Sequence, residues 1–184
     1  MWFLTQEGVD RYDGKYIKHY NFSDDSIKLD SRIALNWLYM DSGNILWVIG
    51  QKGRIFRYDS QHDKFELAYV HPELIRNKPQ AFLNYGYLDK SDRIWLCYKD
   101  SITWYDIRTG TTLHMPTPVN GEITAIEQTD DNHFFIGTGS GLFHARIEKG
   151  KLNIMPDKMM EGIGTSVHEL YYHAVSKQLF VGNY

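Results

Sequence analysis

The feature that most constrains the fold of this chain is an internal repeat. The stretch NILWVIGQKGRIFRYDS, residues 44–60, holds two apolar runs separated by a glycine and ends in Arg-Tyr-Asp. Four other stretches align with it, and their aromatic anchors recur at intervals of 40 to 48 residues, at Trp2, Trp47, Trp95, Phe135 and Phe180. Self-similarity at this period predicts stacked copies of one supersecondary unit.

Each complete copy supplies four short strand-like segments, the number in a β-propeller blade. The first segments read IALNWLYM, AFLNYGYL, EITAIEQ and HELYYHA, and the second read ILWVIG, RIWLCY, HFFIG and LFVG. The third read RIFRYD, SITWYD and GLFHAR, and the fourth FELAYV, TTLHM and KLNIM. We therefore expect an all-β fold of four-stranded antiparallel propeller blades, spanning residues 1–184.

The repeat predicts about four blades' worth of sheet and a partial propeller. The units run approximately over residues 1–25, 26–75, 76–118, 119–160 and 161–184, with the first and last incomplete. A single blade has two exposed faces that neighbouring blades must cover. Four of the aromatic anchors are therefore expected to pack between blades: Trp47, Trp95, Phe135 and Phe180. Gly8, Gly53 and Gly141 are expected to permit the turn between the second and third strands.

Composition excludes several classes of protein. Aromatic residues make up 15% of the chain, which favours strands. A net charge of −3 gives no basic surface for nucleic acid, and the single Cys97 cannot form an internal disulfide. No apolar run is long enough to span a membrane, and the residues after Met1 have no signal-peptide pattern.

The sequence offers no assembled catalytic, metal or cofactor motif. None of its 8 histidines has a tight ligand spacing, and the segment GTGSG, residues 137–141, lacks the Lys-Ser/Thr of a phosphate loop and is expected to be a hairpin turn. His168 and Glu169 could instead face a central channel, as catalytic residues do in some propeller lyases. We expect no catalytic residues, no metal and no cofactor.

Aromatic side chains beside the anchors are the candidate ligand-binding residues, because sugars stack their apolar faces on such rings. The candidates are Trp104, Trp37, Tyr85, Tyr87 and Tyr171. Trp104 ranks first, because it replaces the arginine that precedes Tyr-Asp in other copies. Packing between blades is the alternative for each of them.

The copies resemble the two-component-regulator propeller repeat, D-x-x-G-x-[IL]-W-[IV]-G-T-x-x-G-[IL]-x-R-Y-D. The matching positions in the second copy are Asp41, Gly43, Trp47, Gly50, Gly53, Arg57, Tyr58 and Asp59. The first copy matches at Thr5, Gly8, Arg11, Tyr12 and Asp13, and the later copies match at Trp95, Tyr105, Asp106, Gly137, Thr138, Gly141 and Leu142. One extra residue precedes Arg57, the third copy lacks the Gly-Thr, and the fourth lacks Arg-Tyr-Asp.

The resemblance implies a non-catalytic, ligand-sensing segment of a periplasmic hybrid two-component sensor of the kind common in gut Bacteroidetes. Such sensors typically bind oligosaccharides and act as dimers, with a histidine kinase and a DNA-binding regulator encoded beyond the propellers. No kinase or receiver motif lies in this chain. Two alternatives stay open: a propeller lyase or glycosidase fragment, and an assembly module that associates with itself through sheet edges.

Overall fold

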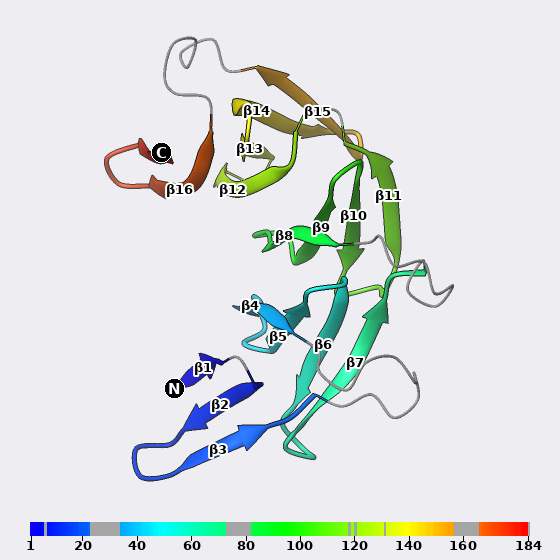
Figure 1. The fold of residues 1–184 in the computed structure, drawn as a ribbon, viewed down its shortest axis with the longest axis vertical. Helices are drawn as coiled ribbons and strands as arrows, with labels where there is room; N and C mark the ends of the chain where they lie inside the picture. The colour runs from blue at the N-terminus through cyan, green and yellow to red at the C-terminus, as the bar shows by residue number, and fades with distance from the viewer. Residues whose placement is uncertain are drawn as a thin grey trace. The chain divides into compact units, whose positions relative to one another are not determined.

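The computed structural model describes residues 1–5, 7–22, 34–72, 82–117, 119, 121–130, 132–156 and 166–183. The secondary-structure elements among these residues are β-strands, numbered β1 to β17 in chain order. Figure 1 labels β1 to β16, and β17 follows β16 at the C-terminal end. All of the paired strands run antiparallel to their neighbours in sequence. The predicted all-β fold of short antiparallel strands is confirmed.

The first two sheets lie in the N-terminal half of the chain. The first has the order β1-β2-β3, with β1 (Trp2–Leu4), β2 (Val9–Tyr12) and β3 (Ile17–Tyr20). The second has the order β4-β5-β6-β7, with β4 (Leu35–Met40), β5 (Leu46–Gly50), β6 (Arg54–Asp59) and β7 (Lys64–Val70). These strands fall within the first two expected repeat units.

The remaining sheets follow the same plan. The third has the order β11-β10-β9-β8, with β8 (Leu83–Leu88), β9 (Arg93–Tyr98), β10 (Ser101–Asp106) and β11 (Thr112–Pro116). The fourth has the order β12-β13-β14-β15, with β12 (Ile123–Asp130), β13 (His133–Thr138), β14 (Gly141–Glu148) and β15 (Lys151–Pro156). The fifth pairs β16 (Val167–His173) with β17 (Gln178–Asn183).

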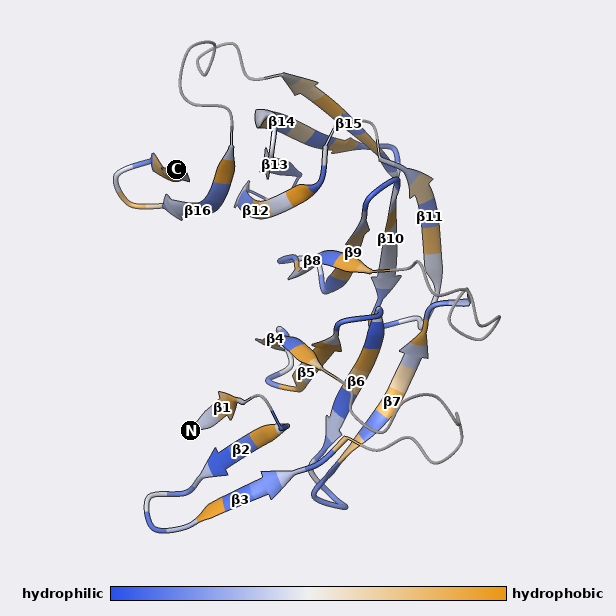
Figure 2. Cartoon of the chain, in the orientation of Figure 1, coloured by the Kyte–Doolittle hydropathy of each residue, from blue (hydrophilic) through white to orange (hydrophobic). Residues whose placement is uncertain are grey.

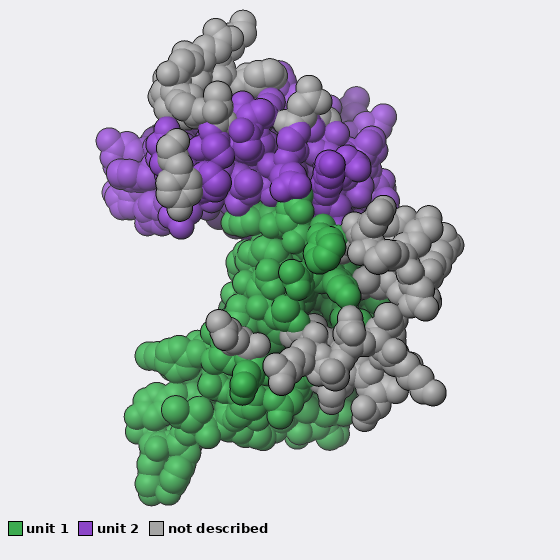
Figure 3. All heavy atoms as spheres, in the orientation of Figure 1, with its two compact units in different colours: residues 1–86 green, residues 87–184 purple. Residues whose placement is uncertain are grey.

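The chain divides into two compact units, residues 1–86 and 87–184, drawn in green and purple in Figure 3. The division falls within β8. In the first unit, Val9, Val48 and Phe56 form a buried cluster, and Trp2, Leu4, Phe22, Leu35, Leu38 and Phe65 pack against it. This cluster joins the first sheet to the second by burial of apolar surface.

In the second unit, the core joins the third sheet to the fourth. Trp95 of β9 and Phe134 of β13 are both fully buried, and their ring centroids lie 4.9 Å apart. The hydrophobic colouring of β9 in Figure 2 reflects a strand whose residues from Ile94 onward are all buried. A strand that packs on both faces loses the alternation of apolar and polar residues, and β9 shows that loss.

The aromatic anchors occupy equivalent positions in the ladders. Each anchor of the first four sheets lies opposite a third-strand residue in the same register: Trp2 with Arg11, Trp47 with Arg57, Trp95 with Trp104, and Phe135 with His144. On the first-strand side, the same position pairs Trp47 with Tyr39, Phe135 with Glu127, and Phe180 with Tyr171. The sheets are thus copies of one unit residue by residue.

The equivalent anchors differ in burial. Trp47 and Trp95 are 2% and 0% exposed, and Phe135 is half-buried with its ring stacked on His144 at 4.4 Å. Phe180 is 55% exposed, as is its cross-strand neighbour Tyr171 at 59%. The expectation of packing between blades is therefore wrong for Phe180 among the four anchors, because no described sheet covers its ring.

Two of the three predicted turn glycines have the expected backbone. Gly53 has a φ of 75° and Gly141 a φ of 134°, in the region that side chains rarely adopt. Gly8 also lies in the turn between its strands, but its φ is not in that region, and an added Cβ would lie 2.2 Å from the carbonyl oxygen of Tyr20. Gly8 is therefore required by close approach of β3 rather than by turn geometry.

Candidate functional site

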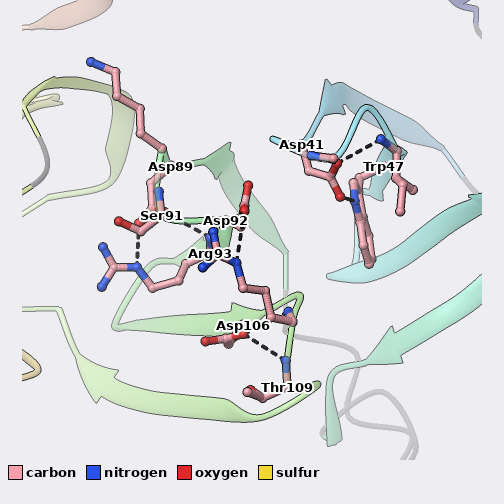
Figure 4. Close-up of polar contacts among 12 residues, drawn as sticks. Asp41, Trp47, Asp89, Ser91, Asp92, Arg93, Asp106 and Thr109 are labelled. Carbon is pink, nitrogen blue, oxygen red and sulfur yellow. Dashed lines mark hydrogen bonds and ion pairs between the residues drawn. The ribbon is translucent and has the colours of Figure 1, made fainter.

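An aspartate organises the turn that precedes two of the tryptophan anchors, Trp47 and Trp95. Asp41 accepts hydrogen bonds from the backbone N–H groups of Gly43 and Ile45 and from the indole Nε1 of Trp47, each at 2.8 Å (Figure 4). In the next copy, Asp89 accepts the bond from Trp95 Nε1 at 2.9 Å. An aspartate six residues before the tryptophan therefore fixes the turn and the anchor together in both copies.

The Tyr-Asp marks cap a second turn, between the third and fourth strands. Asp13, Asp59 and Asp106 each accept hydrogen bonds from the backbone N–H groups two and three residues further on. Figure 4 shows one of them, from Thr109 to Asp106. The aspartates of the Tyr-Asp marks therefore have a structural role as caps of this turn.

Trp104 lies in the packed interior of the third sheet. It is 4% exposed, its ring centroid lies 5.0 Å from that of Trp95, and the guanidinium carbon of Arg93 lies 5.1 Å from its centroid. A ring so covered offers no face to a sugar. The hypothesis that Trp104 stacks on a ligand is therefore corrected: the residue replaces an arginine because it packs against Trp95.

Trp37 and Tyr85 are brought together on neighbouring first strands, β4 and β8. Their ring centroids lie 5.9 Å apart at an interplanar angle of 72°, and both side chains are partly exposed. Gly86 makes this contact possible, because an added Cβ there would lie 3.0 Å from the Trp37 ring. The hydroxyl of Tyr39 also donates to the carbonyl oxygen of Gly86 at 2.8 Å, which fixes β8 beside β4.

The other two aromatic candidates lie in the second unit, Tyr87 on β8 and Tyr171 on β16. Tyr87 is partly buried, and its hydroxyl accepts a hydrogen bond from the backbone N–H of Gln128 at 3.2 Å. Tyr171 is exposed on β16, with its centroid 6.2 Å from that of Phe180. Tyr87 thus has a structural contact, whereas Tyr171 presents an open aromatic face.

The structure reveals one polar cluster that the sequence did not indicate, around Asp63. Its carboxylate accepts hydrogen bonds from Lys18 at 2.5 Å, Tyr20 at 2.6 Å, Arg11 at 2.9 Å, and Tyr58. Asp63 lies in the turn after β6, whereas three of its partners lie on β2 and β3. The cluster therefore joins the first sheet to the second. Its members come from two different repeat units, so no local sequence pattern predicts it.

The electrostatics of this cluster favour the charged carboxylate. Hydrogen bonds from Lys18, Tyr20 and Tyr58 hold the pKa of Asp63 well below its usual value. Burial, followed by the hydrogen bond to Asp63, raises the pKa of Tyr20 far above that of a free tyrosine. Both shifts keep Asp63 ionised and Tyr20 protonated near neutral pH, as an ion pair with hydroxyl donors requires.

In the part of the chain that the structure describes, no three His, Cys, Asp or Glu side chains gather where they could hold a metal ion. His168 is exposed on β16 and lies 2.8 Å from the hydroxyl of Ser166. Burial raises the pKa of Glu127, whose carboxylate accepts a hydrogen bond from the backbone N–H of Tyr172 at 3.2 Å.

None of the described segments forms a helix of the length and apolarity that crossing a membrane requires.

Comparisons with known proteins identify the class of fold. No protein-family model and no curated protein matches the chain. Among solved structures, the extracellular domain of the putative hybrid two-component system BT4673 from B. thetaiotaomicron matches with a TM-score of 0.71 and 16% identity, covering 98% of this chain and 24% of that chain. The β-propeller domain of Cps50 (Swd1) from Myceliophteria thermophila matches with a TM-score of 0.65 and 13% identity, over 97% of this chain and 60% of that one.

An enzyme is similar as well. A catalytically inactive variant of virginiamycin B lyase from Staphylococcus aureus, solved with quinupristin, has a TM-score of 0.66 and 17% identity, over 92% of this chain and 55% of that chain. At these identities the likeness shows the fold alone. The chain has the blade architecture of a β-propeller, in a partial form, and it spans about a quarter of the length of the sensor ectodomain it matches.

Proposed function

We propose that this chain is the ligand-sensing propeller segment of a periplasmic hybrid two-component sensor and that it does not catalyse a reaction. The observation that carries the proposal is the likeness to a two-component ectodomain over 98% of the chain. The repeat marks support it, since Asp41, Trp47 and Tyr58 match the two-component-regulator repeat and have consistent structural roles. Signal transmission to a kinase is assigned to parts of such a sensor beyond this segment.

We propose an oligosaccharide as the ligand. The support is the Trp37–Tyr85 pair, because partly exposed rings on adjacent strands offer apolar faces on which sugar rings stack. Tyr171 offers a third exposed ring, on β16. The Trp37–Tyr85 pair, rather than Trp104, is the site at which we expect a sugar to stack.

A thermal-shift screen of the 184-residue chain against a broad panel of oligosaccharides tests this proposal. A ligand that binds only the folded state raises the melting temperature in a concentration-dependent way. The proposal expects a saturable rise for at least one member of the panel. An unchanged melting temperature across the panel, with no heat on calorimetric titration, would contradict it.

A lyase is the second candidate function, supported by the likeness to virginiamycin B lyase and by the exposed His168 beside Ser166. It requires converging ionisable groups. Incubation of the chain with polyuronate chains and with cyclic depsipeptides, followed by mass spectrometry, would detect cleavage. Product formation that disappears in a His168→Ala variant would replace the sensor proposal with this one.

An assembly role is the third candidate, supported by the exposed face of Tyr171 and Phe180. The equivalent face of the third sheet, at Trp95, is fully buried. A second copy of the chain covering this face would make a dimer of the kind expected from the resemblance. Light scattering that finds a monomer at every protein concentration would exclude it.

A further inference from the structure

The first and fifth sheets each present one face that no other described sheet covers. In the first sheet, Trp2 and Leu4 pack against the buried cluster that joins the first two sheets. Phe3 lies between them in β1, so its side chain points to the opposite face, where it is 44% exposed. In the fifth sheet, Phe180 and its cross-strand neighbour Tyr171 lie on the exposed face, which we name the Phe180 face.

Cross-strand register defines the uncovered face of the first sheet, which we name the Phe3 face. Phe3 pairs with Asp10, and Asp10 pairs with His19, in one row across the three strands. Two residues further along β2, Tyr12 pairs with Ile17, and both of these side chains are exposed. Figure 2 shows hydrophobic colouring on β1 and at the start of β3. The Phe3 face is therefore largely apolar, with Asp10 and His19 as its polar members.

The repeat position of Phe3 is fully buried in the other copies. Phe3 directly follows the anchor Trp2. The residues that directly follow the anchors of the second, third and fourth sheets are 0% exposed: Val48, Leu96 and Ile136. Val48 shows what covers this side of a sheet, because it packs in one cluster with Val9 of the preceding sheet. The Phe3 face is therefore the side on which a preceding sheet packs.

The Phe180 face is the other half of the same kind of contact. Trp95, the anchor equivalent to Phe180, is fully buried against Phe134 of the following sheet. Residues two apart on a strand share a face, so Phe134 lies on the same side of its sheet as Ile136. Since Ile136 is the equivalent of Phe3, the contact between the third and fourth sheets joins a Phe180-type face to a Phe3-type face.

The polar pair on the Phe3 face is compatible with burial. Asp10 and His19 form an ion pair at 2.5 Å. The same row of the third sheet holds Thr103 and His114, whose Oγ1 and Nδ1 atoms lie 2.7 Å apart. Thr103 is fully buried there. A polar side chain in this row is therefore tolerated inside a contact when the neighbouring strand supplies its hydrogen-bond partner.

We propose that copies of this chain bind head to tail, with the Phe180 face of one copy packed on the Phe3 face of the next. The contact would place Phe180 against Met1 and Phe3, the equivalents of Phe134 and Ile136, and would bury apolar surface on both copies. A two-fold contact between Phe180 faces would leave the Phe3 face uncovered, whereas a heterologous contact covers both. This inference develops the assembly role and is independent of the sensing function.

Sedimentation velocity over a range of protein concentrations tests the contact on the wild type and on two face variants. The wild type should sediment as two or more copies, with a mass that rises with concentration. Phe180→Glu and Phe3→Glu should each be monomeric where the wild type associates, because each places an unpaired charge in one half of the contact. An equimolar mixture of the two variants should form a one-to-one dimer, because each supplies the face that the other has lost.

Two exposed residues in turns provide matched controls. Val175→Glu alters the turn between β16 and β17, and Tyr16→Glu alters the turn between β2 and β3. Both variants should associate like the wild type, since neither residue lies on a strand of the contact. Phe3 and Phe180 are themselves exposed, so an unchanged melting temperature of each monomeric variant is expected and shows that the fold is kept.

The outcomes separate this contact from the functions proposed above. A wild type that stays monomeric at every concentration would overturn the contact and the assembly role and leave the sensing proposal standing. Association that Phe3→Glu retains and Phe180→Glu loses would indicate a two-fold contact, which keeps the assembly role and overturns the head-to-tail arrangement. A mixture of the two variants that stays monomeric would overturn that arrangement as well.

Discussion

The indole Nε1 of Trp95 donates a hydrogen bond to the carboxylate of Asp89 at 2.9 Å, in the buried interior of the second unit. The same carboxylate also accepts bonds from the backbone N–H groups of Ser91 and Arg93 and from Arg93 Nε (Figure 4). Asp41 and Trp47 repeat the arrangement one copy earlier. A single acidic side chain thus sets both the turn geometry and the rotamer of the anchor in each of these copies.

Replacing Asp89 should lower the free energy of unfolding. Asp89→Ala leaves a buried indole N–H and the partly buried Arg93 without their acceptor, so we expect the free energy of unfolding to fall by about 3–5 kcal/mol. Urea denaturation followed by tryptophan fluorescence measures the change. Asp106→Ala, which removes a turn cap in the same unit, is the control and should cost about 1 kcal/mol or less. Equal losses for the two variants would contradict the role assigned to Asp89.

The buried and the exposed aromatic anchors should contribute unequally to the free energy of unfolding. Trp95→Ala removes a fully buried ring, and we expect a loss of about 3–5 kcal/mol in the free energy of unfolding. Phe180→Ala changes the equivalent position in the same unit, but its ring is mostly exposed, so the loss should be about 1 kcal/mol or less. A large loss at Phe180 in dilute solution would show that its face is covered, which the assembly role requires.

The Asp63 cluster should make the stability of the first unit sensitive to acid. The pKa of Asp63 is lowered in the folded state, so its ionisation stabilises the fold above the pKa of an unfolded aspartate, about 4. That contribution is lost as the pH falls below about 4 toward the lower folded-state pKa. Urea midpoints of the wild type and of Asp63→Asn should therefore converge between pH 5 and pH 2, taken as roughly the window of carboxylate titration. A difference that stays constant over this range would contradict the ionised cluster.

Much of the fold could be predicted from the sequence because the repeat marks are local. The Asp turns, the Tyr-Asp caps and the turn glycines each act within one sheet, and the anchors mark the same position in each ladder. The spacing of these marks therefore indicates strands and register, as with Trp47 opposite Arg57 and Trp95 opposite Trp104. The spacing of the repeat marks does not predict the contacts between sheets. Asp63 meets Arg11 across 52 residues, and nothing near either residue indicates the partner.

The sequence also does not predict which face of the sheet each candidate ligand residue occupies. The sequence placed Trp37, Tyr85 and Trp104 on strands, but which face each ring occupies depends on how neighbouring sheets pack. Trp104 proved to be buried beside Trp95, whereas Trp37 and Tyr85 came together with partly exposed rings. The close approach at Gly86 also depends on two strands from different repeat units, and no local pattern predicts it.

Calorimetric titration of the wild type and of Trp37→Ala with the best oligosaccharide from the screen tests the sensing proposal most directly. We predict saturable binding by the wild type and about tenfold or greater weakening in Trp37→Ala, because one ring of the Trp37–Tyr85 pair is lost. Trp104→Phe, altered at the buried ring, should bind like the wild type. Binding that survives in Trp37→Ala and is lost in Trp104→Phe would contradict the placement of the ligand, and an absence of heat from the wild type would contradict the sensing function itself.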